Sequence, residues 1–444
     1  MRSSRSNRSR SDNNKLSLNS IKFEVAWARY ALILLAVVAA VTAVYQARLD
    51  LAASAAYQGL APRNPDSRLL AEWMIAAAPD DPYVRLATAH YYEKTFESND
   101  LQKALAEFER AAALSPDHYG VWLQLGAARD REGDDAGAEA AYRRALELAP
   151  NYTSVSWAYG NSLLRHGNTE HGFQLIAKAA ASDPNYSAPA VSTALHFFDG
   201  SPEDVRRVLG SNASTNASLT LILATQKKWD AAYDAWSRIP ADARANYRDI
   251  GNWVVKSAAD ARQTRIAASI YGDLMGPSVS LPAVGNVTNG GFEDGVKLRN
   301  AGIFDWQIAE GTEPQIGLSE GVKKSGRYSM SITFDSFEAS EFRTISQRVP
   351  VEPGASYEFE FFYRADIKSR ANFKWDVIDL DQNVLATTDA LSNNGDWASL
   401  RTRFTVPAQM DGVVIRFVRS GCGTAGACPV TGKIFFDDLS LKRP

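Results

Sequence analysis

The sequence predicts a multidomain chain in which one N-terminal apolar helix is followed by an all-α solenoid of helical hairpins and then by an all-β sandwich. Three observations carry this prediction: an uncharged run from Tyr30 to Ala47, three prolines at a constant interval of 34 residues, and an alternation of apolar and polar residues after residue 286. A chain of 444 residues is too long for one compact core, which agrees with several domains.

Composition and charge narrow the class of protein. Hydrophobic residues at 45% and charged residues at 22% are ordinary for a folded chain. Residues 1–29 hold seven Lys or Arg against two acidic residues, a local charge of +5, so the remainder carries −8 when the whole chain carries −3. The remainder offers no broad basic surface, and we expect no nucleic-acid partner. The Ser/Arg/Asn-rich tail is typical of a disordered segment.

The apolar run at residues 30–47 has the length of a membrane span. Eighteen uncharged residues rise about 27 Å as a helix, which is just enough to cross a bilayer. Tyr30 and Tyr45 lie where interfacial aromatic residues belong, and the basic tail precedes the run. We therefore expect a single-pass anchor in the inner membrane, with residues 1–29 cytoplasmic and the bulk periplasmic. A cleaved signal peptide is the alternative, because Val41 to Ala43 loosely resembles a cleavage site.

The helical middle, residues 48–276, shows an internal period. Pro116, Pro150 and Pro184 are each 34 residues apart, and a fixed period of this size indicates a solenoid of stacked hairpins. Small residues such as Gly126 and Ala138 let paired helices approach closely, and large residues such as Tyr142 fill the gaps between them. One hairpin cannot bury its apolar face alone, so we expect about five or six helical pairs between residues 50 and 276.

The stretch VWLQLGAARDREGDDAGAEAAYRRALELAP closely resembles the tetratricopeptide repeat, a helix-turn-helix unit of this length. The resemblance rests on the positions Trp122, Leu125, Gly126, Gly133, Ala138, Tyr142, Ala145 and Pro150. It implies a concave groove that binds a peptide or another protein. Carrying the groove positions of the family onto the first helix of each hairpin gives Asp130, Arg131, Trp157, Asn161 and Arg165. The alternative is that these side chains simply face solvent.

Residues 277–285 are rich in Gly, Pro, Ser and Val and read as a linker, after which residues 286–444 alternate like strands. In RYSMSITF, the residues Met330, Ile332 and Phe334 share one face, and YEFEFF and NFKWDV repeat the pattern. Seven to nine short strands without intervening helices indicate a β-sandwich.

The motifs NGGFEDG, SGRYSMSI, VPVEPGASYEFEFFYRA, GDWASLRTRFTVP and FFDDLSL resemble family 4 and family 9 carbohydrate-binding modules, which are jelly rolls of the galactose-binding type. The resemblance implies a structural calcium that ties the first strand to the last. Glu293 and Asp437 match the ligand positions. The alternation places Asp437 on the interior face with Phe435 and Leu439, where a carboxylate needs a partner. In the alternative reading, Asp437 merely accepts backbone hydrogen bonds.

Saccharide binding requires an exposed aromatic ring and polar groups for the hydroxyls. Trp306, Trp375 and Trp397 are the candidates, and the alternative for each is a place in the core. Cys422 and Cys428 are separated by a Gly-rich spacer of five residues that can bring their Cα atoms within disulfide range. A bridge predicts an oxidising compartment for this domain, and two free thiols on a loop are the alternative.

The sequence contains no nucleotide-binding loop, nucleophile elbow or zinc-binding helix, so we expect no catalytic activity. The predicted function is a membrane-anchored scaffold or adaptor that binds a protein partner, with polysaccharide as a second ligand of the sandwich, in envelope polysaccharide assembly or export. The envelope role is an analogy at the level of fold. A cell-surface lectin with the solenoid as spacer is the alternative. A glycoside hydrolase would need two flanking carboxylates, and pairs such as Asp379 and Asp381 are also common in surface turns.

Overall fold

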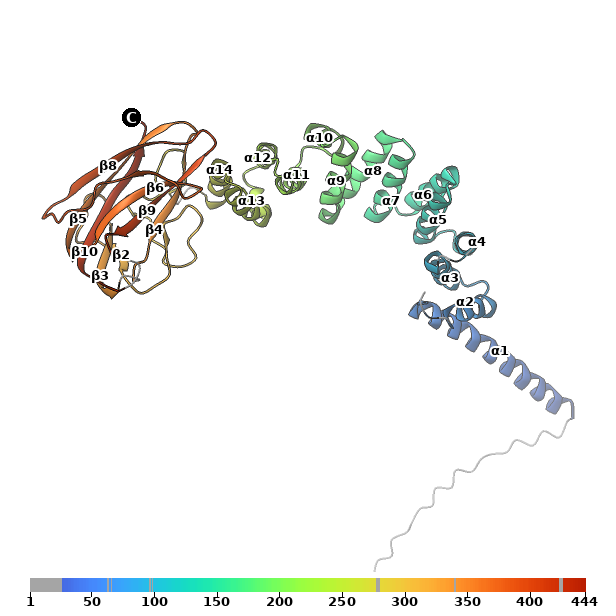
Figure 1. Cartoon of the computed structure of the whole chain (residues 1–444). Coiled ribbons are helices and arrows are strands. Elements are labelled where there is room, and N and C mark those ends of the chain that lie inside the picture. Colours follow the sequence, from blue (N-terminus) through green and yellow to red (C-terminus); the bar gives the residue numbers. More distant parts are fainter. Residues whose placement is uncertain are drawn as a thin grey trace, which may run out of the picture. The chain divides into compact units, whose positions relative to one another are not determined.

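The computed structural model describes residues 26–61, 64, 66–95, 97, 99–276, 280–338, 341–422 and 426–444. The chain divides between Gly172 and Phe173 into two compact units. Helices precede strands along the chain (Figure 1), which confirms the predicted fold class. Residues 1–25 of the predicted tail and residues 277–279 of the predicted linker lie outside the described residues.

The first unit, up to Gly172, is helical. Its long first helix contains the segment Trp27–Gln58, which among the described residues is long and apolar enough to cross a membrane by length and composition. The helices of this part are α1 (Ala26–Gln58), α2 (Asp66–Ala77), α3 (Pro82–Thr95), α4 (Asp100–Leu114), α5 (Tyr119–Glu132), α6 (Asp135–Leu148), α7 (Thr153–Arg165) and α8 (Thr169–Ser182), of which α8 crosses into the second unit.

The hairpin of α5 and α6 shows why these residues form a tight pair. Gly133 ends α5 in the left-handed conformation, at φ 78°, and the Asp134 side chain caps α6 by accepting from the Gly137 amide at 3.0 Å. A Cβ on Gly126 would lie 2.9 Å from the Tyr142 ring, so only glycine lets the two helices approach this closely. The 34-residue pattern therefore reflects packing between paired helices.

The second unit continues the hairpins from Phe173. In the described chain, α3 to α14 follow one another as six successive hairpins, preceded by α1 with α2, where the sequence predicted five or six pairs. The helices of this part are η1 (Pro184–Tyr186), α9 (Ser187–Phe197), α10 (Pro202–Leu209), α11 (Ala213–Thr225), α12 (Trp229–Ser237), η2 (Arg244–Tyr247), α13 (Arg248–Asp260) and α14 (Thr264–Met275).

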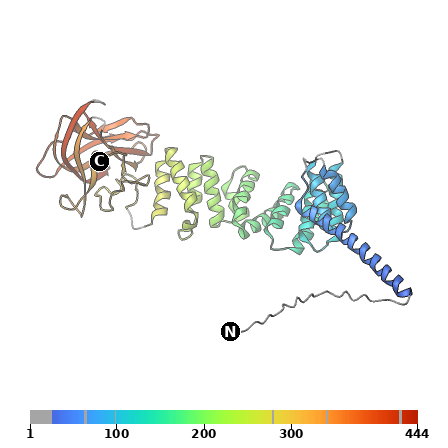
Figure 2. The ribbon, with the colours of Figure 1, turned by 90° about the horizontal axis from the view of Figure 1, so that it is seen from below.

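The strands form two antiparallel five-stranded sheets, in the orders β1-β4-β9-β6-β7 and β2-β3-β10-β5-β8. Both figures show the strands as two layers (Figures 1 and 2). Buried aromatic rings fill the space between the layers, with Trp375 lying 5.4 Å from Phe417 and 5.3 Å from Phe436 between ring centroids. The strands are β1 (Gln307–Ile308), β2 (Gln315–Ser319), β3 (Ser329–Glu338), β4 (Ile345–Pro350), β5 (Ser356–Ser369), β6 (Asn372–Asp379), β7 (Val384–Thr387), β8 (Ala398–Thr405), β9 (Gly412–Ser420) and β10 (Ala427–Lys442).

Strand β10 breaks the expected alternation. Its pairing with β5 shifts between Asp437 and Ser440, and Asp438 has a positive φ of 51°. The shift follows Asp437, so Phe435 and Asp437 share the face of β10 opposite to the core-facing Phe436, whereas Leu439 beyond the bulge faces the core. The predicted placement of Asp437 on one interior face with Leu439 was therefore wrong. Asp437 is nevertheless fully buried.

The double glycine of the NGGFEDG motif allows the start of the sandwich to meet its last strand. The Leu439 amide donates to the Gly290 carbonyl at 3.0 Å. A Cβ on Gly290 would lie 2.0 Å from the Leu439 carbonyl oxygen, whereas a Cβ on Gly291 would have its nearest neighbour at 3.6 Å. A glycine at position 290 is therefore required for the close approach of this backbone to Leu439, whereas a glycine at position 291 is not.

The last helical hairpin packs directly on the sandwich within the second unit. The Asp411 carboxylate accepts from the Thr264 and Arg265 amides at the start of α14, at 2.8 and 2.9 Å. The Tyr271 and Phe304 rings are 5.4 Å apart, and Arg348 of β4 donates to the Ala259 carbonyl at 2.8 Å. Since anions stabilise helix N-termini, Asp411 holds α14 against the sandwich by charge as well as by hydrogen bonds.

We predict that Gly290→Ala lowers the melting temperature of the sandwich, because the new methyl group collides with the Leu439 carbonyl. A clash of this kind costs about 1–3 kcal/mol, which corresponds to several degrees for a domain of this size. Gly291→Ala is the matched control and should leave the melting temperature nearly unchanged. Equal melting temperatures for the two variants in calorimetry would contradict this role of Gly290.

Candidate functional site

The predicted groove residues of the first unit take part in ion pairs between successive hairpins. Arg131 of α5 pairs with Glu93 of α3, and Arg165 of α7 pairs with Asp130 of α5. The Asp130 carboxylate is almost buried, with a side-chain exposure of 6%. The first helices of three consecutive hairpins are thus linked along one face by charged side chains.

The other groove candidates have local partners. The Asn161 amide donates to the Trp157 carbonyl of its own helix at 2.8 Å, and Trp157 is half-buried. His166 also approaches the Asp130 carboxylate, at 3.2 Å. The sequence pattern did not identify Glu93 or His166, because neither occupies a position that the repeat alignment marks. Binding of a partner by this face stays a prediction.

Burial shapes the electrostatics beneath the groove. Burial raises the pKa of Tyr142 to about 12, so its hydroxyl stays protonated at physiological pH. Burial also lowers the pKa of Arg131 from its ordinary value.

Two of the three tryptophans predicted for saccharide binding lie in the core. Trp306 is 2% exposed and its indole nitrogen donates to the Asn289 carbonyl at 3.1 Å, while Trp375 is fully buried. Neither ring offers a face to a saccharide, so the interpretation of these two as binding platforms is not supported. Trp397 is half-buried and remains a candidate.

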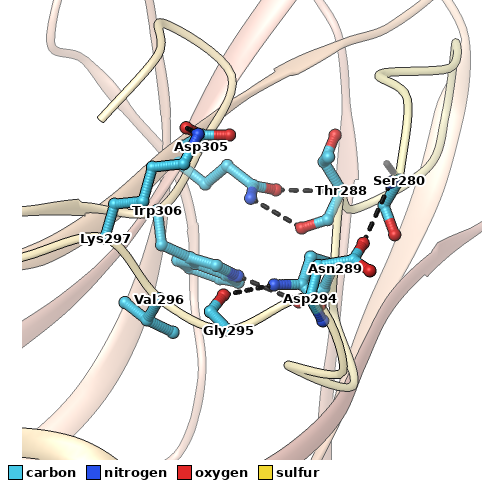
Figure 3. A pocket seen from close by; sticks show the side chains of 10 residues that line it. Ser280, Thr288, Asn289, Asp294, Gly295, Val296, Lys297, Asp305 and Trp306 are labelled. Atoms are coloured by element: carbon cyan, nitrogen blue, oxygen red, sulfur yellow. Dashed lines mark hydrogen bonds and ion pairs between the residues drawn. The ribbon is translucent and has the colours of Figure 1, made fainter. Parts of the chain in front are cut away.

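Asn289, Asp294 and Gly295 of the NGGFEDG motif line a small pocket of about 40 Å³ (Figure 3). Asn289 donates to the Gly295 carbonyl at 2.7 Å, and the Ser280 amide donates to the Asp294 carboxylate at 2.9 Å. The buried Thr288 hydroxyl has no hydrogen-bond partner among the described residues. A space of this size holds about one water and is too small for a sugar.

The predicted calcium ligands both bind one turn of the sandwich. Asp437 accepts from the amides of Lys324 and Ser325 at 2.7 and 3.1 Å, and Glu293 accepts from the amide of Arg327 at 2.9 Å. These carboxylates, one from each end of the sandwich sequence, therefore hold the turn at residues 324–328 between them. The backbone hydrogen bonds to Asp437 match the alternative reading of this residue.

The donor set fits calcium in chemical type. Within the described ranges no three His, Cys, Asp or Glu side chains gather to hold a metal, so a bound ion would also need backbone carbonyls. Burial, together with the neighbouring charge of Asp438, raises the pKa of Asp437, and the backbone hydrogen bonds oppose this shift. A buried carboxylate in such surroundings gains from a nearby cation.

Cys422 and Cys428 form a disulfide, with their Cα atoms 6.1 Å apart. The bridge joins the end of β9 to the start of β10, and Cys428 is buried against the core of the sandwich. It therefore closes the connection between two strands that belong to different sheets.

Comparisons with known proteins assign both kinds of module. Residues 284–421 match the model of a carbohydrate-binding domain family, and residues 95–155 match the model of tetratricopeptide repeats. The chain therefore carries tetratricopeptide repeats followed by a β-sandwich of the carbohydrate-binding type, as the motifs predicted. Tetratricopeptide repeats are protein-interaction modules, so the two matches together support a carbohydrate-binding adaptor.

Individual similar proteins cover parts of the chain. A mouse protein, the O-mannosyl-transferase TMTC1 of Mus musculus, is 40% identical over 55 residues, which are 12% of this chain and 6% of that protein. The chain thus spans only a small fraction of this relative. A solved structure described as "CBM4 structure and function" is 18% identical, with a TM-score of 0.26, over 36% of this chain and 99% of its own. The crystal structure of MamA is 15% identical, with a TM-score of 0.30, over 36% of this chain and 88% of its own.

Proposed function

We propose that this chain is a membrane-anchored adaptor without catalytic activity, which binds a protein through its helical groove and a saccharide through its β-sandwich. The observation that supports this most directly is the joining of a protein-interaction repeat and a carbohydrate-binding fold on one chain that also has an apolar N-terminal helix. In the proposed setting, the helix anchors the chain in the inner membrane, and the bulk takes part in envelope polysaccharide assembly or export.

Two independent features support the proposed compartment. The basic tail before the apolar helix favours retention of residues 1–29 in the cytoplasm. The Cys422–Cys428 disulfide favours an oxidising compartment for the sandwich. Both features are consistent with a helix that crosses the membrane once and leaves the solenoid and the sandwich on the periplasmic side. The boundaries of the tail, span, solenoid, linker and sandwich are part of this proposal.

The lectin reading is the second candidate, because one observation favours it. Asp130, Arg131 and Arg165 already pair with groups of the same chain, which reduces the free charge that the groove offers to a partner. In that reading the sandwich carries the activity and the solenoid is a spacer.

The proposal predicts that full-length protein in nanodiscs binds at least one polysaccharide on an array and releases no reducing ends from it during prolonged incubation. A photo-crosslinker at Asn161 in the groove should also trap a discrete protein in cells, whereas one at the exposed Glu147 of α6 should not. Saccharide binding with equal crosslinking at the two positions favours the lectin. Binding to no polysaccharide overturns the saccharide half of the proposal, and release of reducing ends overturns the non-catalytic half.

We also propose that a structural calcium binds at Asp437 and Glu293 with backbone carbonyls. The ion would offset the buried charge of Asp437 and join the two ends of the sandwich sequence. Chelation with EDTA should then lower the melting temperature of the sandwich by several degrees, and added calcium, but not magnesium, should restore it. Asp437→Asn should abolish this calcium response. A melting temperature unaffected by chelation, together with no calcium in elemental analysis of the purified protein, would exclude the ion.

A further inference from the structure

A depression beside the edge strand β1 gathers cationic side chains. It has a volume of about 640 Å³, and its lining includes Lys297, Arg299, Gln307, Ile308, Glu310 and Arg343. We refer to it as the cationic pocket. It lies wholly in the sandwich and is more than ten times larger than the pocket of Figure 3. It therefore has room for a sugar residue, which the smaller pocket does not.

Arg343 is held in place for recognition of an anion. Its Nε donates to the Ala309 carbonyl at 2.9 Å, and its aliphatic stem lies against Gly311, where a Cβ would be 3.0 Å from the arginine Cγ. No carboxylate of the described residues pairs with its guanidinium within 4.0 Å. Because one edge of the guanidinium is fixed, its two terminal nitrogens are oriented while they still lack an anionic partner.

The other charges of the pocket leave it net positive. Lys297 is neutralised by Asp305, which lies 2.8 Å away. Arg299 is exposed and makes no ion pair with the described residues, and Glu310 is the one acidic side chain among the lining residues given above. Ile308 and the half-exposed Leu298 add apolar surface beside the arginines. The pocket thus offers two free guanidinium groups next to a small apolar wall.

We propose that the cationic pocket binds an acidic saccharide, with Arg343 and Arg299 holding the carboxylate of a uronic acid residue. This inference rests on the proposed saccharide-binding function and specifies the class of saccharide. Guanidinium groups bind carboxylates in a bidentate manner, and the apolar wall suits the carbon-bound hydrogens of a pyranose ring. The family match covers these residues, which favours a saccharide over other carboxylates.

The test measures binding of full-length protein in nanodiscs to polygalacturonate and to its methyl ester, which has the same backbone without the charge. Wild-type protein should bind the acid form at least tenfold more tightly, and the difference should shrink as salt screens the charges. Arg343→Ala with Arg299→Ala should weaken binding to the acid form at least tenfold. Arg364→Ala, an exposed arginine on β5 in the other sheet, is the matched control and should have no effect.

The outcomes separate the two levels of the hypothesis. Equal binding of acid and ester, or equal loss in the Arg364→Ala control, overturns the cationic pocket and leaves saccharide binding intact. Binding of neither polymer, nor of any polysaccharide on the array, overturns both. A circular dichroism spectrum of the double variant establishes that the sandwich remains folded.

A second, independent observation concerns the edge of the solenoid near the membrane helix. Helix α1 runs without a break for 33 residues, from the apolar segment into the first hairpin, where Ala52 is fully buried beside Met74 and Ala77. Arg48, just after the apolar run, donates to the Ala76 carbonyl near the end of α2 at 3.3 Å. The turn between α2 and α3 therefore lies level with the end of the apolar run.

Ion pairs continue this edge along the first unit. Arg110 near the end of α4 pairs with Asp80 in the turn between α2 and α3, at 2.9 Å. Arg144 near the end of α6 pairs with Asp117 in the turn between α4 and α5, at 3.4 Å. The turns that join successive hairpins thus follow one another along the edge that α1 enters.

Aromatic rings line the same edge. Tyr83 lies 6.3 Å from His118, His118 stacks on Tyr119 at 5.8 Å, and Tyr119 lies 4.5 Å from Tyr152, between ring centroids. Tyr83 is 64% exposed and Tyr152 is 54% exposed. These four residues form a continuous aromatic row, which we call the tyrosine edge.

We propose that the tyrosine edge rests on the lipid headgroups of the membrane that holds α1. This inference rests on the proposed anchoring of the chain. Tyrosine prefers the membrane interface, because its ring is apolar and its hydroxyl stays hydrated. The continuity of α1 and the Arg48 contact with Ala76 put the turn between α2 and α3 near the bilayer surface, and in this proposal the edge continues along that surface through the first three hairpins.

Environment-sensitive labels can locate this edge. The described chain has no free cysteine, so a single introduced cysteine accepts a fluorophore selectively. Labels at Tyr83→Cys and Tyr152→Cys in full-length protein in vesicles should be quenched at least twofold more by spin-labelled lipids than a label at Glu132→Cys. Glu132 is exposed and ends α5, about 20 Å along the helix from Tyr119.

If the protein floats with the vesicles but the three labels are quenched equally, the proposed lipid contact of the tyrosine edge is wrong and the anchoring stands. Protein that does not float with the vesicles overturns the anchoring as well. Quenching at Tyr83 and Tyr152 but not at Glu132 supports the proposed contact with lipid.

Discussion

The contact between Asp411 and the first amides of α14 supports the arrangement of the whole second unit. A stack of helical hairpins always leaves an apolar face on its last member, and a solenoid needs a cap there. Here the sandwich covers that face. Asp411 satisfies two amides that every helix start leaves unpaired, and Gly412 fits against Thr264, where a Cβ would lie 2.3 Å from the threonine hydroxyl.

The same contact limits where the sandwich can bind a ligand. Arg348 on β4 is engaged with the Ala259 carbonyl, and Arg262 pairs with Asp381 after β6, so helical residues occupy part of the outer side of the sheet β1-β4-β9-β6-β7. Burial beside the hairpin lowers the pKa of Arg348. A saccharide must therefore use a surface away from the hairpin. The residues that line the cationic pocket beside β1 all belong to the sandwich, whereas Trp306 and Trp375 are buried and offer no such surface.

The sequence predicted the fold well because the forces that define it are local and periodic. The proline interval located the hairpins, and alternation located β3, β5 and β6 with their buried residues Met330, Phe359 and Trp375. Alternation could not reveal the bulge in β10, since a bulge depends on pairing with β5 and not on residue type. The burial of Trp306, which precedes β1 in the chain, likewise follows from its tertiary contact with the Asn289 carbonyl.

The candidate sites were less predictable, because they too depend on contacts between segments that are far apart in the sequence. The repeat alignment placed Arg131 and Arg165 on one face, but their partners Glu93 and Asp130 come from neighbouring hairpins and depend on how the hairpins stack. Gly290 belongs to the NGGFEDG motif that carries the resemblance, whereas its approach to Leu439 joins residues almost 150 positions apart and depends on the folded sandwich. Arg343 and Arg299 belong to no motif and meet only in the folded chain.

The central physical claim is that the last hairpin, α13 with α14, and the sandwich unfold as one cooperative unit. Native-state hydrogen exchange of the full-length protein tests this claim most directly. In the wild type, amides of α14 and β9 should open with the same free energy, because they unfold together. Asp411→Ala should lower the opening free energy of the α14 amides by about 1 kcal/mol and that of the β9 amides by less. The control Asp389→Ala, at an exposed position, should leave both opening free energies unchanged. If α14 in the wild type already opens at a much lower free energy than β9, and Asp411→Ala leaves it unchanged, the sandwich does not cap the solenoid.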